Sequence, residues 1–132
     1  MPLENEIAEI LKESKTIAVV GMSKNPEKAA HRIPRYLQSV GYKIIPVNPT
    51  ADKILGEKAY NSLEEIPIPV DIVDVFRPSE HTPTVVRSAM KLKPKLIWLQ
   101  LGISNEESKS LTLENGIAYV ENKCLMVEHR KI

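Results

Sequence analysis

Short runs rich in valine and isoleucine alternate along the chain with longer segments of mixed polar and apolar residues. Several of these runs are almost continuously apolar, which is typical of parallel strands that are covered on both faces. The runs are also too short to be helices of ordinary length. We therefore predict five strands, at residues 16–20, 42–47, 71–75, 96–99 and 117–120.

The segments between the predicted strands carry apolar residues at helical spacing, and they predict four helices. The second contains Pro34, which either lies in the first turn of a helix that begins near residues 30–32 or kinks a longer helix. Ser104 and Glu107 form a capping box for the fourth. The four apolar stripes are Leu3, Ile7, Ile10 and Leu11; Ala29, Ile33, Leu37 and Val40, closed by Gly41; Val85, Val86, Ala89 and Met90, capped by Ser79 or Thr82; and Leu111, ending before Gly116.

This alternation of strand and helix predicts an α/β fold with three layers. With right-handed crossovers, the strands form an open, mostly parallel five-stranded sheet with helices on both faces. Residues 48–69 are the longest irregular region, with a short edge strand expected around residues 57–60. Ligands of such folds bind in a crevice at the carboxyl ends of the strands, so the loops that follow the strands should hold the functional residues.

Composition narrows the class of protein. A chain of 132 residues, 42% hydrophobic and 27% charged, suits one compact domain. With 18 Lys and Arg against 17 Asp and Glu, it has no strong positive field for a nucleic acid. Its apolar runs are far shorter than the ~20 residues of a membrane span, and its first residues lack a signal-peptide core, so we expect a cytoplasmic protein without a membrane partner. A single cysteine excludes an internal disulfide framework, and three scattered histidines argue against a metal site.

The loop after the first predicted strand contains a partial nucleotide-binding motif. Residues 21–26 occupy the register of the dinucleotide fingerprint G-x-G-x-x-G, with Ser23 in place of the second glycine and Pro26 in place of the third. Gly21 permits the tight turn, and successive backbone N–H groups would bind an anion with help from Ser23 and Lys24. A plain strand-to-helix turn that needs a glycine explains this loop equally well.

The loops after the other strands add further candidates. Residues 47–49 lack the acidic side chain that binds ribose hydroxyls in NAD-binding domains, so NAD is disfavoured. Phe76 and Arg77 suit an adenine ring and a phosphate, by stacking and by a bidentate fork. Gln100 is polar at the functional end of a buried strand, and Gly102 would let the backbone approach a ligand.

Four further residues are candidates for ligand binding. Arg32, near the start of the second helix, is the favoured second anion clamp. Lys53 and Lys58 would suit an extra phosphate, and a solvated loop explains them equally. Cys124 follows the last strand, where Lys123 would favour its thiolate, and a role as a small buried apolar residue is an equal alternative.

Six ordered motifs, covering about residues 14–128, resemble one known family. They read TIAVVGMSKNP, HRIPRYLQSVGY, IIPVNP, VDIVDVFRPSE, LIWLQLGISNEES and VENKCLMVEH. The chain is similar to the CoA-binding proteins related to the N-terminal domain of the succinyl-CoA synthetase alpha subunit. This resemblance implies a Rossmann-like fold, residues 1–132 as a single CoA-binding domain, and coenzyme A as the cofactor.

The resemblance also implies which part of coenzyme A each candidate residue contacts. Arg32 and Lys53 match positions where a basic residue suits the ribose or diphosphate phosphates, and Cys124 lies near the place of the coenzyme's thiol. The remaining contacts that the resemblance implies are Gly21, Met22, Ser23 and Lys24 with the phosphates, Val47, Asn48, Pro49, Phe76, Arg77 and Pro78 around the adenosine end, and Gln100, Leu101 and Gly102 beside the pantetheine arm.

The expected function is non-catalytic binding of CoA or an acyl-CoA, with a mixed disulfide between Cys124 and CoA under oxidising conditions. The ligase itself relies on a phosphorylated histidine in a following domain and on a nucleotide-binding partner subunit, so we expect no synthesis of succinyl-CoA. The alternative is an NAD(P)-binding oxidoreductase or redox sensor that uses the same crevice. The missing acidic residue after Val47 and the absence of a general base in the strand-end loops argue against it. A second copy of the chain or an acyl-CoA enzyme would suit such a module as a protein partner.

Overall fold

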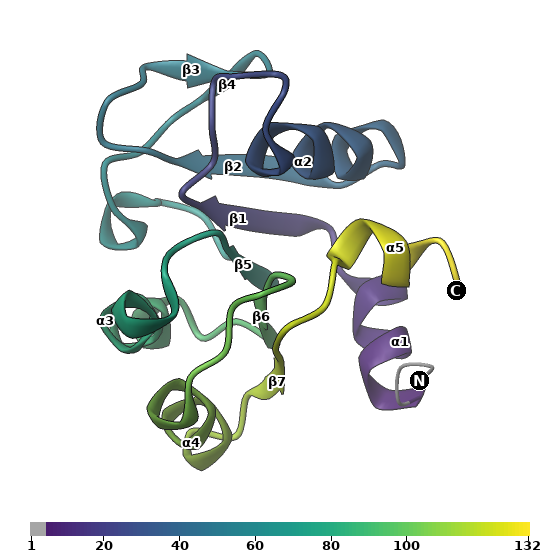
Figure 1. Cartoon of the computed structure of the whole chain (residues 1–132), viewed down its shortest axis with the longest axis vertical. Coiled ribbons are helices and arrows are strands. Elements are labelled where there is room, and N and C mark those ends of the chain that lie inside the picture. The colour runs from purple at the N-terminus through teal and green to yellow at the C-terminus, as the bar shows by residue number, and fades with distance from the viewer. Residues whose placement is uncertain (1–4) are drawn as a thin grey trace.

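The computed structural model describes residues 5–132 and contains a five-stranded sheet in the order β2-β1-β5-β6-β7 (Figure 1). All four strand pairings are parallel. The predicted strands are confirmed to within a residue at their ends, as β1 Thr16–Val20, β2 Lys43–Val47, β5 Ile72–Val75, β6 Leu96–Leu99 and β7 Ala118–Val120.

The order of the strands fixes where a crevice lies. From β1 the chain first builds β2 on one side, and it then crosses to the other side of β1 to build β5. The connections therefore leave the carboxyl ends of β1 and β5 in opposite directions, which opens a crevice between them. Since all five strands are parallel, the loops that follow them meet along this same edge of the sheet.

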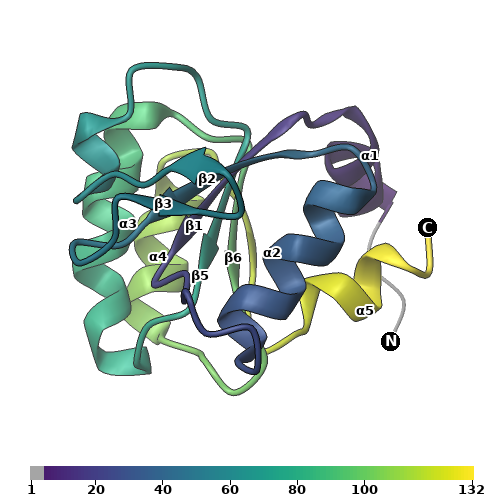
Figure 2. The ribbon, with the colours of Figure 1, turned by 90° about the horizontal axis from the view of Figure 1, so that it is seen from above.

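Helices cover both faces of the sheet, so the predicted three-layer Rossmann-like architecture is confirmed. Figure 2 shows α1 (Asn5–Glu13), α2 (Ala29–Ser39) and α5 (Leu125–His129) on one face, and α3 (Thr82–Ala89) and α4 (Glu106–Glu114) on the other. Alternate strand residues serve two apolar clusters: Ile17 and Val19 of β1 belong to the cluster under α1, α2 and α5, whereas Ala18 and Val20 belong to the cluster under α3. Leu3, predicted in the first helix, lies outside the described residues.

The region between β2 and β5 is more ordered than the sequence indicated. It holds an antiparallel hairpin of β3 (Lys53–Ile54) and β4 (Glu57–Lys58), followed by a single 3-10 turn, η1 (Leu63–Glu65). Leu55 and Gly56 turn the hairpin with φ angles of 54° and 77°, as a two-residue loop between twisted strands requires. Tyr60 then pairs with Val47, so the predicted edge strand around residues 57–60 exists only in short pieces.

One prediction about the helices is wrong, and some short helical elements were not predicted. The capping box of Ser104 and Glu107 is wrong, because the N-cap of α4 is Asn105, whose side chain accepts the N–H of Ser108. The sequence analysis missed α5, since five residues are too few to show a helical period. It also missed the 3-10 turns that flank α3, η2 (Ser79–His81) and η3 (Met90–Leu92). Among residues 5–132, no helix has the length and apolar character needed to cross a membrane.

Candidate functional site

Gly21 joins the ends of three strands at the mouth of the crevice. Its N–H donates to the carbonyl of Val47 at 3.1 Å, and its φ is +82°. A Cβ at this position would lie 2.3 Å from the carbonyl oxygen of Phe76 and 3.3 Å from Cδ of Arg77. Only glycine fits, because both the φ angle and the close approach of β5 exclude a side chain. The structure thus brings together the predicted candidates of β1, β2 and β5.

Most backbone donors of the loop after β1 already have partners within the protein. The hydroxyl of Ser23 accepts the N–H of Asn25, and the side chain of Asn25 accepts the N–H of Glu27, both at 3.0 Å. The N–H of Ser23 itself is bonded to helix α2. The predicted row of successive free N–H groups is therefore wrong. Among residues 5–132, those of Met22 and Lys24 are the loop donors that no hydrogen bond uses.

Pro34 explains how this loop is attached to α2. It lies inside the helix, which begins at Ala29, so the first-turn alternative is excluded and Pro34 belongs to the interior of the longer helix. A proline lacks the N–H that would bond the carbonyl four residues before it. That carbonyl belongs to Ala30, and it accepts the N–H of Ser23 at 3.1 Å instead. The buried His31 adds a second tie, with its Nδ1 2.8 Å from the carbonyl oxygen of Ser23.

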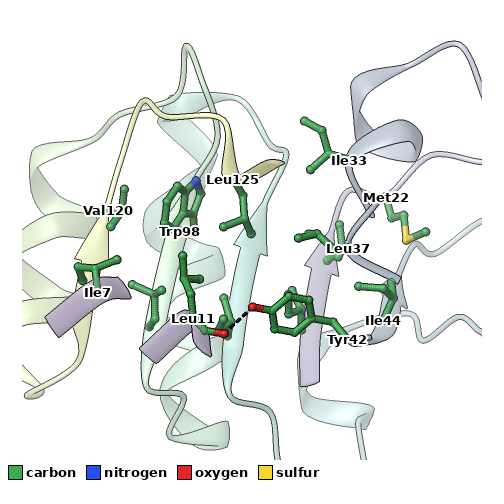
Figure 3. Packing of buried hydrophobic residues seen from close by; sticks show 14 of the residues in the cluster. Ile7, Leu11, Met22, Ile33, Leu37, Tyr42, Ile44, Trp98, Val120 and Leu125 are labelled. Carbon is green, nitrogen blue, oxygen red and sulfur yellow. Dashed lines mark hydrogen bonds between the residues drawn. The ribbon is translucent and has the colours of Figure 1, made fainter. Parts of the chain in front are cut away.

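The side chains of Asn48 and Met22 contact other parts of the protein and support the backbone of the crevice. Nδ2 of Asn48 donates to the carbonyl of Met22 at 2.9 Å, and Oδ1 accepts both the N–H and the hydroxyl of Thr50. The side chain of Met22 is 1% exposed and belongs to the apolar cluster, on the side of Leu37 and Ile44 in Figure 3. Met22 therefore presents only its backbone to a ligand.

The predicted positive side chains around the loop after β1, which are those of Lys24, Arg32 and Arg77, are all exposed. Lys24 lies on the loop, and the Arg32 guanidinium donates to the carbonyl of Glu27 in the same loop. The Arg77 guanidinium lies 3.3 Å from Nδ1 of His81, and its stem passes beside Gly21. Arg77, predicted to bind a phosphate by a bidentate fork, has an exposed side chain. Exposure leaves its charge open to a ligand in solution.

The other candidates on this side differ in how closely they join the crevice. Val47 is buried and contributes its carbonyl, whereas Pro49 and Pro78 are exposed at the starts of their loops. Lys53 lies apart, exposed on the β3–β4 hairpin, which is tied to α2 by a hydrogen bond from Gln38 to the carbonyl of Leu55. No hydrogen bond or ion pair in the described part of the chain joins the side chain of Lys53 to the loop after β1.

The loops after β6 and β7 form the other end of the same edge. Gln100 is only 3% exposed, whereas Leu101 is 69% exposed. The N–H of Gly102 donates to Oδ1 of Asn122 at 2.7 Å, which connects the two loops. Cys124 is partly buried and precedes the first residue of α5. Since β7 is parallel to β6, Cys124 lies on the crevice side of the sheet, as predicted.

Asp74 is a buried acid that the sequence analysis missed. It is fully buried in β5, where its Oδ1 accepts a 2.6 Å hydrogen bond from Nε2 of Gln100. Its Oδ2 has no partner among the described residues. Burial raises the pKa of Asp74 to about 7, although the bond from Gln100 favours the charged form. A carboxylate within an otherwise apolar strand was the available signal, but the search for acids covered only the strand-end loops.

Comparison with known proteins agrees with the motifs. Residues 15–130 match the family described as the CoA binding domain. The chain is 44% identical to the uncharacterized protein YneT of Bacillus subtilis, over 97% of this chain and 95% of that protein. A solved structure from Thermus thermophilus, cell-free ID.343, is 42% identical with a TM-score of 0.92, and the match covers 97% of this chain and 98% of that one.

A larger enzyme contains a related segment. The ADP-forming acetate–CoA ligase II of Archaeoglobus fulgidus is 34% identical over 83% of this chain, but the match spans only 17% of the ligase. The fold, the crevice and these matches agree with the resemblance found in the sequence, and the chain belongs to the family of CoA-binding domains.

Proposed function

We propose that this protein binds coenzyme A or an acyl-CoA without catalysing a reaction on it, with residues 1–132 acting as a single CoA-binding domain. The observation that carries the proposal is the contact between Gly21 and the carbonyl of Phe76 at the crevice between β1 and β5. This close approach brings the loops after β1 and β5 together at the crevice, in a chain that belongs to a CoA-binding family.

The proposed contacts follow the two ends of the coenzyme. Residues 21–24, with Arg32, would bind the phosphates, for which the free N–H groups of Met22 and Lys24 are suited. Residues 47–49 and 76–78 would surround the adenosine end, and Lys53 would approach the phosphates from the β3–β4 hairpin. Residues 100–102 and Cys124 would lie beside the pantetheine arm and its thiol.

Calorimetric titration of the purified protein tests this proposal. Any ligand that copurifies is removed first, and CoA and NAD are titrated separately at one salt concentration, since phosphate contacts are screened by salt. We expect CoA to bind and NAD not to bind, because the polar side chain after β2 is Asn48, whose Oδ1 is already bonded to Thr50. Binding of NAD alone would contradict CoA binding and favour the NAD-binding alternative. Binding of neither ligand would contradict both hypotheses.

Cys124 gives the proposal a chemical extension. Its thiolate would attack one sulfur of CoA disulfide, form a disulfide bond to that CoA, and release the other CoA as a thiolate. Mass spectrometry after incubation with CoA disulfide should show one added CoA that dithiothreitol removes. The Cys124→Ser variant should show none, and an adduct on that variant would exclude Cys124 as the site.

The proposal also has a consequence for protein partners. If the module delivers CoA to an acyl-CoA enzyme, immobilised protein should retain that enzyme more strongly when CoA is present. If a second copy is the partner, the molecular mass in solution should be that of a dimer. Equal retention with and without CoA, together with a monomeric mass, would leave ligand binding as the function.

A further inference from the structure

Gln100 is held between two groups that together fix the direction of its side-chain amide. Its Oε1 accepts the N–H of Leu125 at 3.3 Å, and its Nε2 donates to Oδ1 of Asp74 at 2.6 Å. A backbone N–H can only donate, so the amide oxygen must face Leu125 and the NH₂ group must face Asp74. Oδ1 of Asp74 accepts from this NH₂ group, so Asp74 reinforces this one orientation.

The segment that Gln100 holds is anchored a second time from the same strand. Nε1 of Trp98 in β6 donates to the carbonyl of Lys123 at 2.8 Å, so both neighbours of Cys124 are bonded to side chains of β6 or of the residue that follows it. The preceding Asn122 has a φ of +57° and accepts the N–H of Gly102. Residues 122–125 are thus attached to the end of β6 and its following loop by side-chain hydrogen bonds and by one backbone bond, from the N–H of Asn122 to the carbonyl of Ile103, rather than by strand pairing.

The burial of Asp74 in the sheet has a large cost in desolvation free energy. Its neighbours in the sheet register, Val19 and Trp98, are 0% exposed, and so is Ile72 on the same face. Within the described residues the carboxylate has no ion pair, and its Oδ2 has no hydrogen-bond partner. An apolar side chain would fill this position at a lower cost in desolvation. The acid therefore needs an explanation beyond packing, and its one side-chain partner is Gln100.

We propose that Asp74 is a positioning residue for the crevice wall made by residues 100–102 and 123–125, and that it acts through Gln100. Asp74 fixes the orientation of the Gln100 amide, and the amide oxygen in turn fixes the position of the Leu125 N–H. The backbone around Cys124 is thereby held in place. This inference rests on the proposed function, because that wall is where the pantetheine arm would lie. Asp74 itself is buried and touches no ligand.

The test compares two ligands that share the nucleotide end. CoA carries the pantetheine arm, and 3′-phospho-ADP is the same nucleotide without it. We expect the wild-type protein to bind CoA more tightly than 3′-phospho-ADP. Asp74→Val, which removes the acceptor for Gln100, should weaken CoA by about tenfold, because a wall displaced by a fraction of an ångström loses its aligned contacts. Its affinity for 3′-phospho-ADP should stay within about twofold.

Asp74→Asn is the conservative variant, because its Oδ1 still accepts from Gln100. It should keep the wild-type ratio of the two affinities, and Ile72→Val, on the same strand and face, serves as the packing control. If Asp74→Val does not fold, Gln100→Glu provides the second route. That change places a second carboxyl group next to Asp74 in place of the donating NH₂ group. It should reduce the ratio of the affinities for CoA and 3′-phospho-ADP. Adding Asp74→Asn to Gln100→Glu should restore most of the ratio, because the introduced amide can donate to the introduced carboxylate.

The outcomes separate this inference from the proposed function. A wild-type protein that binds neither ligand overturns both. A wild-type protein that prefers CoA, with Asp74→Val keeping the same preference, overturns the positioning role alone. Loss of the preference in Asp74→Asn, or failure of Asp74→Asn to rescue Gln100→Glu, would also overturn it. A purely structural defect would weaken the two ligands together and would lower the thermal midpoint of unfolding, which is measured for every variant.

Discussion

The two ends of the crevice are held in shape by different means. On the β1 side, which we define as the loops after β1, β2 and β5, the constraints are in the backbone: Gly21 against Phe76, and the Ala30 carbonyl that Pro34 leaves for the N–H of Ser23. On the β7 side, the loops after β6 and β7, side chains from inside the sheet hold the backbone. Substitutions that add side-chain volume should therefore be most damaging on the β1 side. The β7 side should respond instead to substitutions that change polarity and to pH.

The largest effect should come from Gly21→Ala on the β1 side. The new Cβ would lie 2.3 Å from the backbone carbonyl oxygen of Phe76, which follows β5, and the φ of +82° would be strained in addition. We expect a loss of at least about 3 kcal/mol in the free energy of unfolding, measured by urea denaturation.

Gly102→Ala on the β7 side is the matched control. Its φ is +87°, but nothing lies within 4 Å of the added Cβ. The control should lose only about 1 kcal/mol, the cost of the backbone conformation alone. Equal losses for the two variants would show that close approach to β5 is not what Gly21 provides.

The pH dependence of stability should come from Asp74 in β5, which supports the β7 side through Gln100. Burial raises its pKa to about 7 in the folded protein, above the value of 3.8 for an exposed aspartate. The folded state therefore keeps a proton that the unfolded chain loses, and the free energy of unfolding falls as the pH rises from about 4 to about 7. Asp74→Asn removes this loss, so its stability relative to the wild type should increase over that interval, by on the order of 3 kcal/mol.

Asp71 offers a control of opposite sign on the same segment. Burial raises its pKa, but hydrogen bonds from the N–H groups of Lys15 and Thr16 and the charge of Lys95 outweigh this, and the pKa is lowered. Its contribution to stability is present above the unfolded pKa and is lost as the pH falls through the folded one. Asp71→Asn should therefore lose stability relative to the wild type at neutral pH. Urea denaturation of the three proteins from pH 4 to 8 makes the comparison, and parallel curves for the wild type and Asp74→Asn would contradict the role of Asp74.

The contrast between the two sides also explains which features could be predicted from the sequence. The five strands and the position of Gly21 follow from local patterns, because apolar runs and a tight turn depend on neighbours in the chain. The bond from Ser23 to Ala30 needs the helix to be placed first, since Pro34 shows only that a carbonyl is left free. Asp74 and Gln100 lie 26 positions apart, so their pairing appears only once β5 and β6 are known to be neighbours.

The smallest effect concerns the charge on the β1 side. Arg77 is exposed and its stem passes beside Gly21, which suits contact with a phosphate at the adenosine end of CoA. If it meets the 3′-phosphate, Arg77→Ala should weaken CoA by about 1.5 kcal/mol, roughly tenfold in Kd, and should weaken dephospho-CoA much less. Arg87→Ala is the matched control, since it removes the same charge from α3, where Arg87 pairs with Glu107. Calorimetry of both ligands with both variants makes the measurement, and equal losses of CoA and dephospho-CoA in Arg77→Ala would move this side chain away from the 3′-phosphate.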